Sequence, residues 1–370
     1  MRVLFDITHP AHVHLFKNAI RELWDSGHHV LVTARGKDIT VPLLESYGIP
    51  HVVLSSKSSG IVGTVSEWLL REVRLARIAT EFDPDVIVSR FNPAGAHASK
   101  VVGCPFLMLD DTENESSLIK NLTYPLADAV FTPSCFELEL GDNQIRYDGY
   151  HELAYLHPDR FTPDEAALRD HDIDPDGEYY VIRLTAWDAF HDYGASGVSQ
   201  QTLSEIVSLL SDRGSVYITS EGSVPSALAD YGLEIPPCRI HDLLAFANGY
   251  IGDSGTMATE AAILGTPAIR IDPLAGRHTG GNFVELEERY GLLRSTPHER
   301  EAVRELRAQV SDPRTAEKHR EGVKRLLDDK IDVTAFLLDR IRSVTNDSDP
   351  KRTQRNFSQG EATKPRTTPD

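Results

Sequence analysis

Strand-like and helix-like segments alternate along this chain of 370 residues, and the alternation begins a second time near its middle. The first series opens with a buried strand at 2–7 and an amphipathic helix at 13–26. The second series opens with a strand at 179–184 and a helix at 199–213. Because successive parallel strands need a crossover that is usually helical, this repetition predicts an α/β fold with two doubly wound parallel sheets.

The other expected elements are shorter apolar or amphipathic runs. Strands are expected at 30–34, 51–54, 86–89, 105–109, 128–132, 215–219, 249–252 and 268–271, and helices at 41–47, 63–81, 241–247, 256–264 and across 299–343. These elements divide the chain into an N-terminal domain at 1–150, a linker rich in Pro, Asp and His at 151–177, a C-terminal domain at 178–343 and a polar tail at 344–370 that we expect to be disordered.

The composition excludes some classes of protein. A formal net charge of -18 repels phosphate overall and argues against a nucleic-acid partner. No apolar run is long enough to span a bilayer, and Asp6 interrupts the first apolar segment, so we expect a cytoplasmic protein and leave peripheral attachment at the inner membrane face open. The acidic, lysine-poor surface is typical of salt-loving archaea. Three cysteines, Cys104, Cys135 and Cys238, share no metal-ligand spacing and are interpreted as idle thiols.

A polar turn at the start of the helix 256–264 has the chemistry of a phosphate site. The turn Ser254-Gly255-Thr256 follows an apolar strand, so its free N–H groups and the helix dipole point at the strand end. Glu260 lies within two helical turns of Ser254 and offers a carboxylate to ribose hydroxyls. A second polar turn, Thr8 to His12, ends the first strand of the other series. Two doubly wound domains would place both turns on one cleft.

These motifs resemble a known architecture. Asp253-Ser254-Gly255-Thr256, then Glu260 and Gly265-Thr266-Pro267, are similar to the signature of UDP-N-acetylglucosamine 2-epimerase, with Thr256 in place of a second Gly. That enzyme shares the GT-B fold of many glycosyltransferases, which has two Rossmann-like domains facing a central cleft. Across residues 1 to about 340, the chain is identified as a member of domain-of-unknown-function family 354, archaeal proteins described as predicted glycosyltransferases.

The resemblance implies roles for residues of the second series. Ser254, Gly255 and Thr256 would contact the donor diphosphate, and Glu260 would hold the ribose. The backbone of Ile240 would pair with the base, and Gly281 with Asn282 would hold the donor sugar. The loops that carry the epimerase's catalytic acids and histidine read Arg90-Phe91-Asn92-Pro93, Thr132-Pro133-Ser134-Cys135 and Leu184-Thr185-Ala186-Trp187 here, although Asp110 and Asp111 lie near one acidic position. This difference favours sugar transfer over epimerisation.

A transferase needs a base for the acceptor hydroxyl and positive charge for the leaving diphosphate. We expect His12 to be the base, with His9 in a sugar or acceptor contact; either could instead cap the helix or pack between the domains. Asp111 could orient His12 or the acceptor, or remain a solvated loop carboxylate. Arg183 and Arg270 could clamp phosphate, or serve as structural ion-pair partners.

The loop after the strand 179–184 carries further candidates. Trp187, Asp188 and His191 combine an aromatic face, a carboxylate and an imidazole, which suits contacts with a sugar, although an ordinary packed loop would carry the same residues. No isolated Asp-x-Asp follows a strand, so we expect neither a metal nor a cofactor. The expected partners are a UDP-linked sugar and a glycan, lipid-linked or protein-linked acceptor.

Three hypotheses therefore follow from the sequence. The first is a metal-independent glycosyltransferase acting in envelope or glycan assembly. The second is an epimerase or hydrolase of the nucleotide sugar itself. The third is a non-catalytic nucleotide-sugar binder or scaffold subunit. The sequence leaves open the nucleotide base and sugar of the donor, the acceptor, the stereochemical outcome, the oligomeric state, and whether the catalytic base is His12 or a carboxylate.

Overall fold

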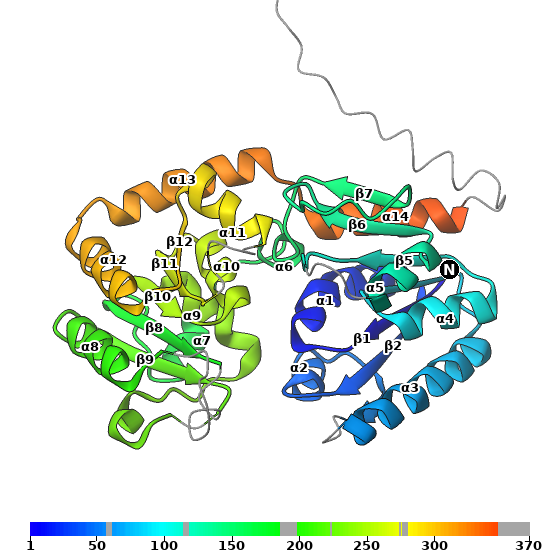
Figure 1. Ribbon diagram of the computed structural model, residues 1–370, viewed down its shortest axis with the longest axis horizontal. Coiled ribbons are helices and arrows are strands. Elements are labelled where there is room, and N and C mark those ends of the chain that lie inside the picture. The colour runs from blue at the N-terminus through cyan, green and yellow to red at the C-terminus, as the bar shows by residue number, and fades with distance from the viewer. Residues whose placement is uncertain are drawn as a thin grey trace, which may run out of the picture.

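Two sheets of parallel strands form two lobes that lie side by side (Figure 1). The computed structural model describes residues 1–56, 61–113, 118–185, 198–222, 224–273, 275 and 280–346. Helices cover both faces of each sheet, as the repeated alternation predicted. The predicted α/β fold with two doubly wound, Rossmann-like halves is confirmed.

The first lobe contains a seven-stranded sheet in the order β3-β2-β1-β4-β5-β6-β7. Its strands are β1 (Arg2–Ile7), β2 (His29–Gly36), β3 (Val52–Ser56), β4 (Val86–Arg90), β5 (Phe106–Leu109), β6 (Ala129–Pro133) and β7 (Gln144–Tyr147). Its helices are α1 (Pro10–Asp25), α2 (Thr40–Ser46), α3 (Ile61–Phe82), α4 (Pro93–Val102) and α5 (Leu118–Thr123). Alternate strand residues enter different cores: Val3 and Phe5 pack with α1, whereas Leu4 packs with α3 and α4.

The second lobe contains a five-stranded sheet in the order β12-β11-β10-β8-β9. Its strands are β8 (Tyr179–Leu184), β9 (Ser215–Ser220), β10 (Gly249–Gly252), β11 (Ala268–Ile271) and β12 (Leu293–Thr296). Its helices are α8 (Gln200–Ser211), α9 (Ile240–Phe246), α10 (Gly255–Leu264), α11 (Gly281–Glu285), α12 (Glu299–Ser311) and α13 (Thr315–Asp329). One face packs against α8 and α12, and the other packs against α9 and α10.

Strand order reverses beside β1 in the first sheet and beside β8 in the second. In doubly wound sheets, ligands bind at such reversals, at the carboxyl ends of the strands. The turn Thr8–His12 follows β1, and the turn Asp253–Thr256 follows β10, the neighbour of β8. Both predicted turns therefore lie at the strand ends where this fold binds ligands.

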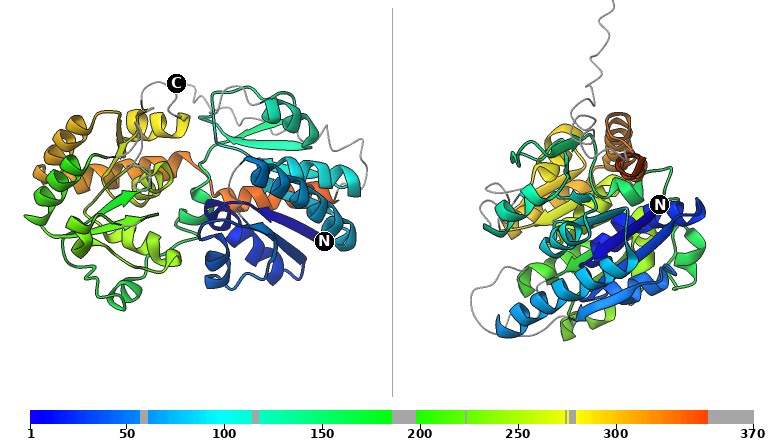
Figure 2. Two further views of the ribbon diagram at one scale, coloured as in Figure 1. Left: turned by 60° about the horizontal axis from the view of Figure 1, so that its bottom comes forward. Right: turned by 90° about the vertical axis from the view of Figure 1, so that its right-hand side faces the viewer.

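The C-terminal helical region is divided into three helices rather than one charged stretch. Pro313 follows α12 and ends it, because proline cannot continue a helix. After α13, α14 (Val333–Asn346) returns to the first lobe and packs against α1 and β4 (Figures 1 and 2). The sequence placed residues up to 343 with the second domain, whereas the contacts of α14 are with the first sheet. The expected disordered tail lies outside the described residues from position 347 onward.

The segment expected as a linker runs between the two lobes and is packed against both. It contains α6 (Leu153–Leu156) and α7 (Glu165–Arg169), and every residue from Tyr150 to Leu156 is buried. Helix α6 contacts α1 and α14 of one lobe and α10 of the other. A single apolar cluster therefore includes Phe5 of the first sheet and Val181 of the second.

None of the helices in the described ranges is both long and apolar enough to cross a membrane.

A buried ion pair attaches α3 to the first sheet. Asp6 is fully buried at the end of β1, and Arg71 Nη2 lies 2.6 Å from its Oδ1. Thr33 Oγ1 donates to the same carboxylate at 2.7 Å, and Asn92 Nδ2 donates to its other oxygen. The carboxylate is thus held by side chains from β2, α3 and the start of α4.

We predict that Arg71→Ala lowers the free energy of unfolding by about 3–5 kcal/mol, because it leaves the Asp6 charge buried without its cation. Urea unfolding followed by circular dichroism measures the change. Arg77→Ala on the same helix is the matched control, since Arg77 pairs with Glu81 on the surface and its loss should leave the midpoint unchanged. Equal midpoints for the two variants would show that the buried pair contributes nothing.

Candidate functional site

The N-terminus of α10 presents free backbone N–H groups at the carboxyl end of β10. Ser254 caps the helix, and its side-chain oxygen accepts from Met257 N at 3.3 Å. Helix geometry leaves the N–H groups of Gly255 and Thr256 without intrahelical acceptors. A Cβ on Gly255 would lie 2.9 Å from the Phe283 ring, so a larger residue here would push that ring aside. These groups and the helix dipole favour an anion here.

Arg270, at the end of β11, adds positive charge beside that helix end. Its Nη2 pairs with Asp272, and its guanidinium carbon lies 3.7 Å from the centre of the Phe283 ring. Its Nε and Nη1 are buried, and the described residues give them no hydrogen-bond partner. Nε lies 3.7 Å from where a Cβ of Gly255 would be, and burial lowers the Arg270 pKa to about 10. A buried guanidinium with two unused donors beside a helix N-terminus is suited to a phosphate.

Arg183, at the end of β8, is held differently. Its Nη2 donates to Glu221 at 3.1 Å, whereas its Nε is buried without a partner among the described residues. Nearby, Asp253 Oδ1 accepts from Thr185 N at 2.8 Å, which fixes the loop before α10. Arg183 thus has the ion-pair role that the sequence left open as well as one unused donor.

Glu260 is buried between the lobes rather than open to solvent. Its Oε1 accepts from Tyr155 Oη of α6 at 2.8 Å and lies 3.0 Å from His241 Nε2 of α9. The His241 ring packs edge-on against His14 of α1, with ring centres 4.6 Å apart. The residue predicted to hold ribose therefore also joins α10 to the connecting segment.

Ile240 begins α9, and its N–H already donates to Pro237 O. Recognition of a base by this N–H would need that bond to open. The side chain of Ile240 is half-buried.

Gly281 and Asn282 bring the second lobe against the strand-end loops of the first. Gly281 N donates to Glu113 Oε1 at 3.0 Å, and a Cβ on Gly281 would lie 1.8 Å from Cys135 O. Asn282 Nδ2 lies 3.5 Å from Thr259 Oγ1 of α10. The loop after β5 and helix α10 are therefore connected through α11.

The two neighbouring aspartates after β5 share Arg90, whose Nη2 lies 3.7 Å from Asp110 Oδ1, but their other partners differ. Asp110 is buried; its Oδ2 accepts from Tyr124 Oη at 2.6 Å and lies 3.2 Å from Lys120 Nζ. Asp111 pairs with Arg90 at the end of β4. Burial raises the pKa of Asp111, but Arg90 and a nearby histidine outweigh it and hold the pKa well below its usual range. Asp110 is thus enclosed by its own lobe, whereas Asp111 is an ionised carboxylate at the strand ends.

His9 and His12 both interact with the backbone around the start of α1. His9 caps α1, and its Nδ1 accepts from Ala11 N at 3.2 Å. His12 is buried, and its Nδ1 accepts from Thr8 N at 3.3 Å. Burial is the main cause that lowers the His9 pKa to about 4 and the His12 pKa well below its usual value. Both rings are neutral near pH 7.

Two buried residues of the connecting segment, His151 and Glu152, join this group, and neither was expected from the sequence. His151 Nδ1 lies 2.7 Å from Asp111 Oδ2. Glu152 is buried beside it, and burial together with the charge of Asp111 raises its pKa to about 8. Only the histidine and acid content of the segment pointed to them, because the segment has no strand or helix periodicity.

Trp187, Asp188 and His191 lie outside the described residues. The cluster His157, Asp159 and Asp332 could offer ligand atoms to a metal, but Arg160 already pairs with Asp332 at 2.6 Å.

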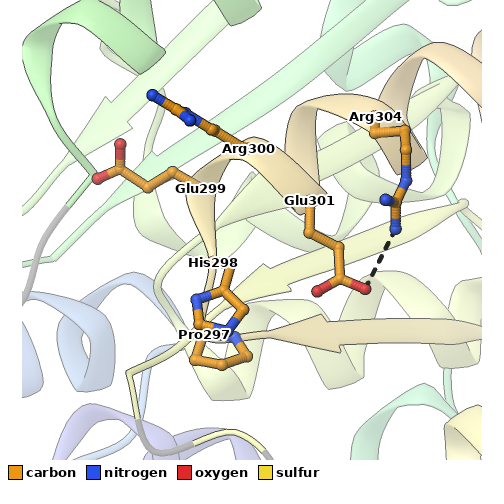
Figure 3. A pocket seen from close by; sticks show the side chains of 6 residues that line it. All are labelled: Pro297, His298, Glu299, Arg300, Glu301 and Arg304. Carbon is orange, nitrogen blue, oxygen red and sulfur yellow. Dashed lines mark hydrogen bonds and ion pairs between the residues drawn. The ribbon is translucent and has the colours of Figure 1, made fainter.

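A hollow of about 800 Å³ lies elsewhere, at the start of α12 (Figure 3). Pro297, His298 and charged side chains line it, and Arg304 pairs with Glu301 at 3.4 Å. None of the residues predicted for the site lines this hollow. Its two arginines and two glutamates balance one another, so its charge selects no ligand.

Residues 1–341 match the model of the family described as protein of unknown function, DUF354. The chain belongs to this family. It is also similar to the uncharacterized protein MJ0665 of Methanocaldococcus jannaschii, with 22% identity over 281 residues that cover 73% of this chain and 82% of the relative.

Solved structures with the same fold include two kinds of enzyme. The UDP-GlcNAc 2-epimerase from Neisseria meningitidis bound to UDP-GlcNAc has a TM-score of 0.63 at 13% identity, covering 93% of this chain and 100% of that one. A putative UDP-N-acetylglucosamine 2-epimerase from Listeria monocytogenes has a TM-score of 0.66 at 12% identity, covering 93% and 95%. The calicheamicin glycosyltransferase CalG4 has a TM-score of 0.56 at 14% identity, covering 94% and 99%. At these identities the likeness shows the GT-B fold alone.

We predict that Glu152→Gln stabilises the protein increasingly as the pH rises. The Glu152 pKa is about 8 in the folded protein against 4.5 as a reference, so folding disfavours the ionised form. The free energy that wild-type folding loses to the buried Glu152 is absent below pH 4.5 and grows as the pH rises. It reaches on the order of 4 kcal/mol near pH 8.

Thermal unfolding at a series of pH values from 5 to 8 measures the gap in stability between the variant and the wild type. The exposed Glu139, replaced by Gln, is the control and should show no gap that grows with pH. A constant gap for Glu152→Gln would contradict the raised pKa.

Proposed function

We propose that the protein is a metal-independent glycosyltransferase that takes a sugar from a UDP-linked donor and passes it to a glycan, lipid-linked or protein-linked acceptor. The observation that carries the proposal is the N-terminus of α10 with the buried, partly unpaired guanidinium of Arg270 beside it. The two together form a site for two adjacent phosphates.

The proposed donor site follows from the order of these groups around the strand ends. The diphosphate lies on the N–H groups of Gly255 and Thr256, and the Arg270 guanidinium supplies the positive charge that a metal supplies in other designs. Glu260, one and a half turns further along α10, accepts from the ribose. The sugar then extends past Gly281 and Asn282 towards Asp111, since α11 contacts the loop after β5.

A second candidate, epimerisation or hydrolysis of the nucleotide sugar, is supported by one observation. The sequence showed no acid in the loops expected to carry the epimerase's catalytic groups. The structure places Asp111, His151 and the protonated Glu152 together at the strand ends. Such a set can donate and accept protons.

Product analysis separates the candidates. The protein is incubated with UDP-N-acetylglucosamine and UDP-glucose, with and without a mixture of glycan and lipid-linked acceptors, and the products are resolved by chromatography and mass spectrometry. UDP release that depends on an acceptor supports transfer. A new epimer or free sugar without acceptor supports the second candidate, and binding without either product supports a non-catalytic role.

We predict that Arg270→Gln weakens UDP binding by about tenfold or more, because a charge-assisted hydrogen bond contributes roughly 1.5–3 kcal/mol. Isothermal titration calorimetry with UDP measures the affinity.

Arg294→Gln is the matched control, since Arg294 lies on the adjacent strand β12 and pairs with Glu287 and Glu301. Its affinity should equal that of the wild type. Equal affinities for Arg270→Gln and the wild type would show that the diphosphate does not bind at this position.

A further inference from the structure

His151 has the geometry of an oriented imidazole at the strand ends of the first sheet. It lies four residues past β7 and is 5% exposed, and its ring stacks at 15° on Tyr147 with centres 6.4 Å apart. Its Nδ1 is 2.7 Å from Asp111 Oδ2, although the ring is turned away from a straight hydrogen bond. Its Nε2 is buried, with no partner among the described residues.

The partner of each ring fixes where its proton sits. Asp111 is ionised and can only accept, so in the neutral tautomer that suits this contact the proton of His151 is on Nδ1, the nitrogen 2.7 Å from Asp111 Oδ2, and the lone pair is on the buried Nε2. His12 has the opposite arrangement. Thr8 N–H donates to His12 Nδ1, so the neutral His12 ring carries its proton on Nε2 and offers a donor there.

Titratable groups from β4, the loop after β5, α1, β7 and the connecting segment surround His151. Arg90 of β4 pairs with Asp111 Oδ1, whereas His151 lies against the other oxygen, Oδ2. His12 of α1 is close enough for the two rings to affect one another electrostatically. Glu152 follows His151 in the chain and is neutral near pH 7, and Tyr147 covers the ring. Asp111 is thus the anion that faces the imidazole.

We propose that His151 is the catalytic base of the transfer, that Asp111 is its positioning residue, and that His12 donates a hydrogen bond through Nε2 to a substrate oxygen. The proposal rests on the function proposed above. It replaces the sequence-based expectation that His12 is the base. The acceptor oxygen forms a bond to the anomeric carbon while its proton passes to His151 Nε2. The bond from that carbon to the diphosphate oxygen breaks, and the diphosphate leaves with the electron pair. Asp111 stabilises the resulting imidazolium.

The first test reads the ring protons directly and needs no turnover. The full chain is labelled with ¹⁵N-histidine, and two-bond ¹H–¹⁵N spectra near pH 7 report the tautomer of each ring. Spectra of His151→Asn and His12→Gln assign the signals. We expect Nδ1–H for His151 and Nε2–H for His12, with Asp111→Asn changing only the His151 pattern. An Nε2–H tautomer at His151 overturns the inference.

The second test measures UDP release from UDP-N-acetylglucosamine with water as the acceptor. His151→Asn keeps a donor near the Nδ1 position but has no basic nitrogen, so kcat should fall about 100-fold or more while KM changes little. His157→Gln, in the same segment, should match the wild type. Asp111→Asn should lower kcat and displace the pH–rate profile, whereas Glu139→Gln should do neither. Thermal unfolding of each variant shows that it is folded.

The outcomes distinguish the two proposals. A folded His151→Asn with the rate of the wild type overturns the assignment of the base and leaves the proposed transferase intact. A wild-type protein that neither binds UDP nor releases it from the donor overturns the proposed function, and with it the assignment of the base. A large loss of kcat in His12→Gln together with an unchanged kcat in His151→Asn would show that His12 is the catalytic base.

Discussion

The connecting segment packed between the two sheets determines how side chains at the strand ends of both lobes are positioned. All residues from Tyr150 to Leu156 are buried, and α6 contacts helices of both lobes. Tyr155 donates from this connection to Glu260 in α10. A buried polar group must keep its hydrogen bonds, so this contact restricts how the lobes can turn relative to one another. The same segment places His151 beside Asp111. The connection is therefore part of the candidate site as well as a tether.

This arrangement places different charged groups on the two sides of the site. On the second lobe, the N-terminus of α10 and Arg270 attract an anion. On the first lobe, Asp111 is ionised and lies against Arg90 and His151. The contact between Glu113 and Gly281 connects the two sides. The net charge of -18 says little about this site, because a few buried groups determine the local potential.

Features that depend on local sequence were predictable. The two series of strands, the cap at Ser254 and the glycine at 255 follow from periodicity and from turn chemistry. The edge strands β7 and β12 were missed because each has only four residues with polar side chains among them. His151 and Glu152 were missed because their partner, Asp111, is about 40 positions earlier in the chain and only tertiary packing brings them together. The burial of Glu260 against Tyr155 was missed for the same reason.

The central claim is that a nucleotide diphosphate binds at the N-terminus of α10 beside Arg270, and a crystal structure of the protein with UDP tests it most directly. We expect the phosphate oxygens within hydrogen-bonding distance of the N–H groups of Gly255 and Thr256 and of Arg270 Nε or Nη1. UDP bound elsewhere, for example in the hollow at the start of α12, with Arg270 in contact with no phosphate, would contradict the account.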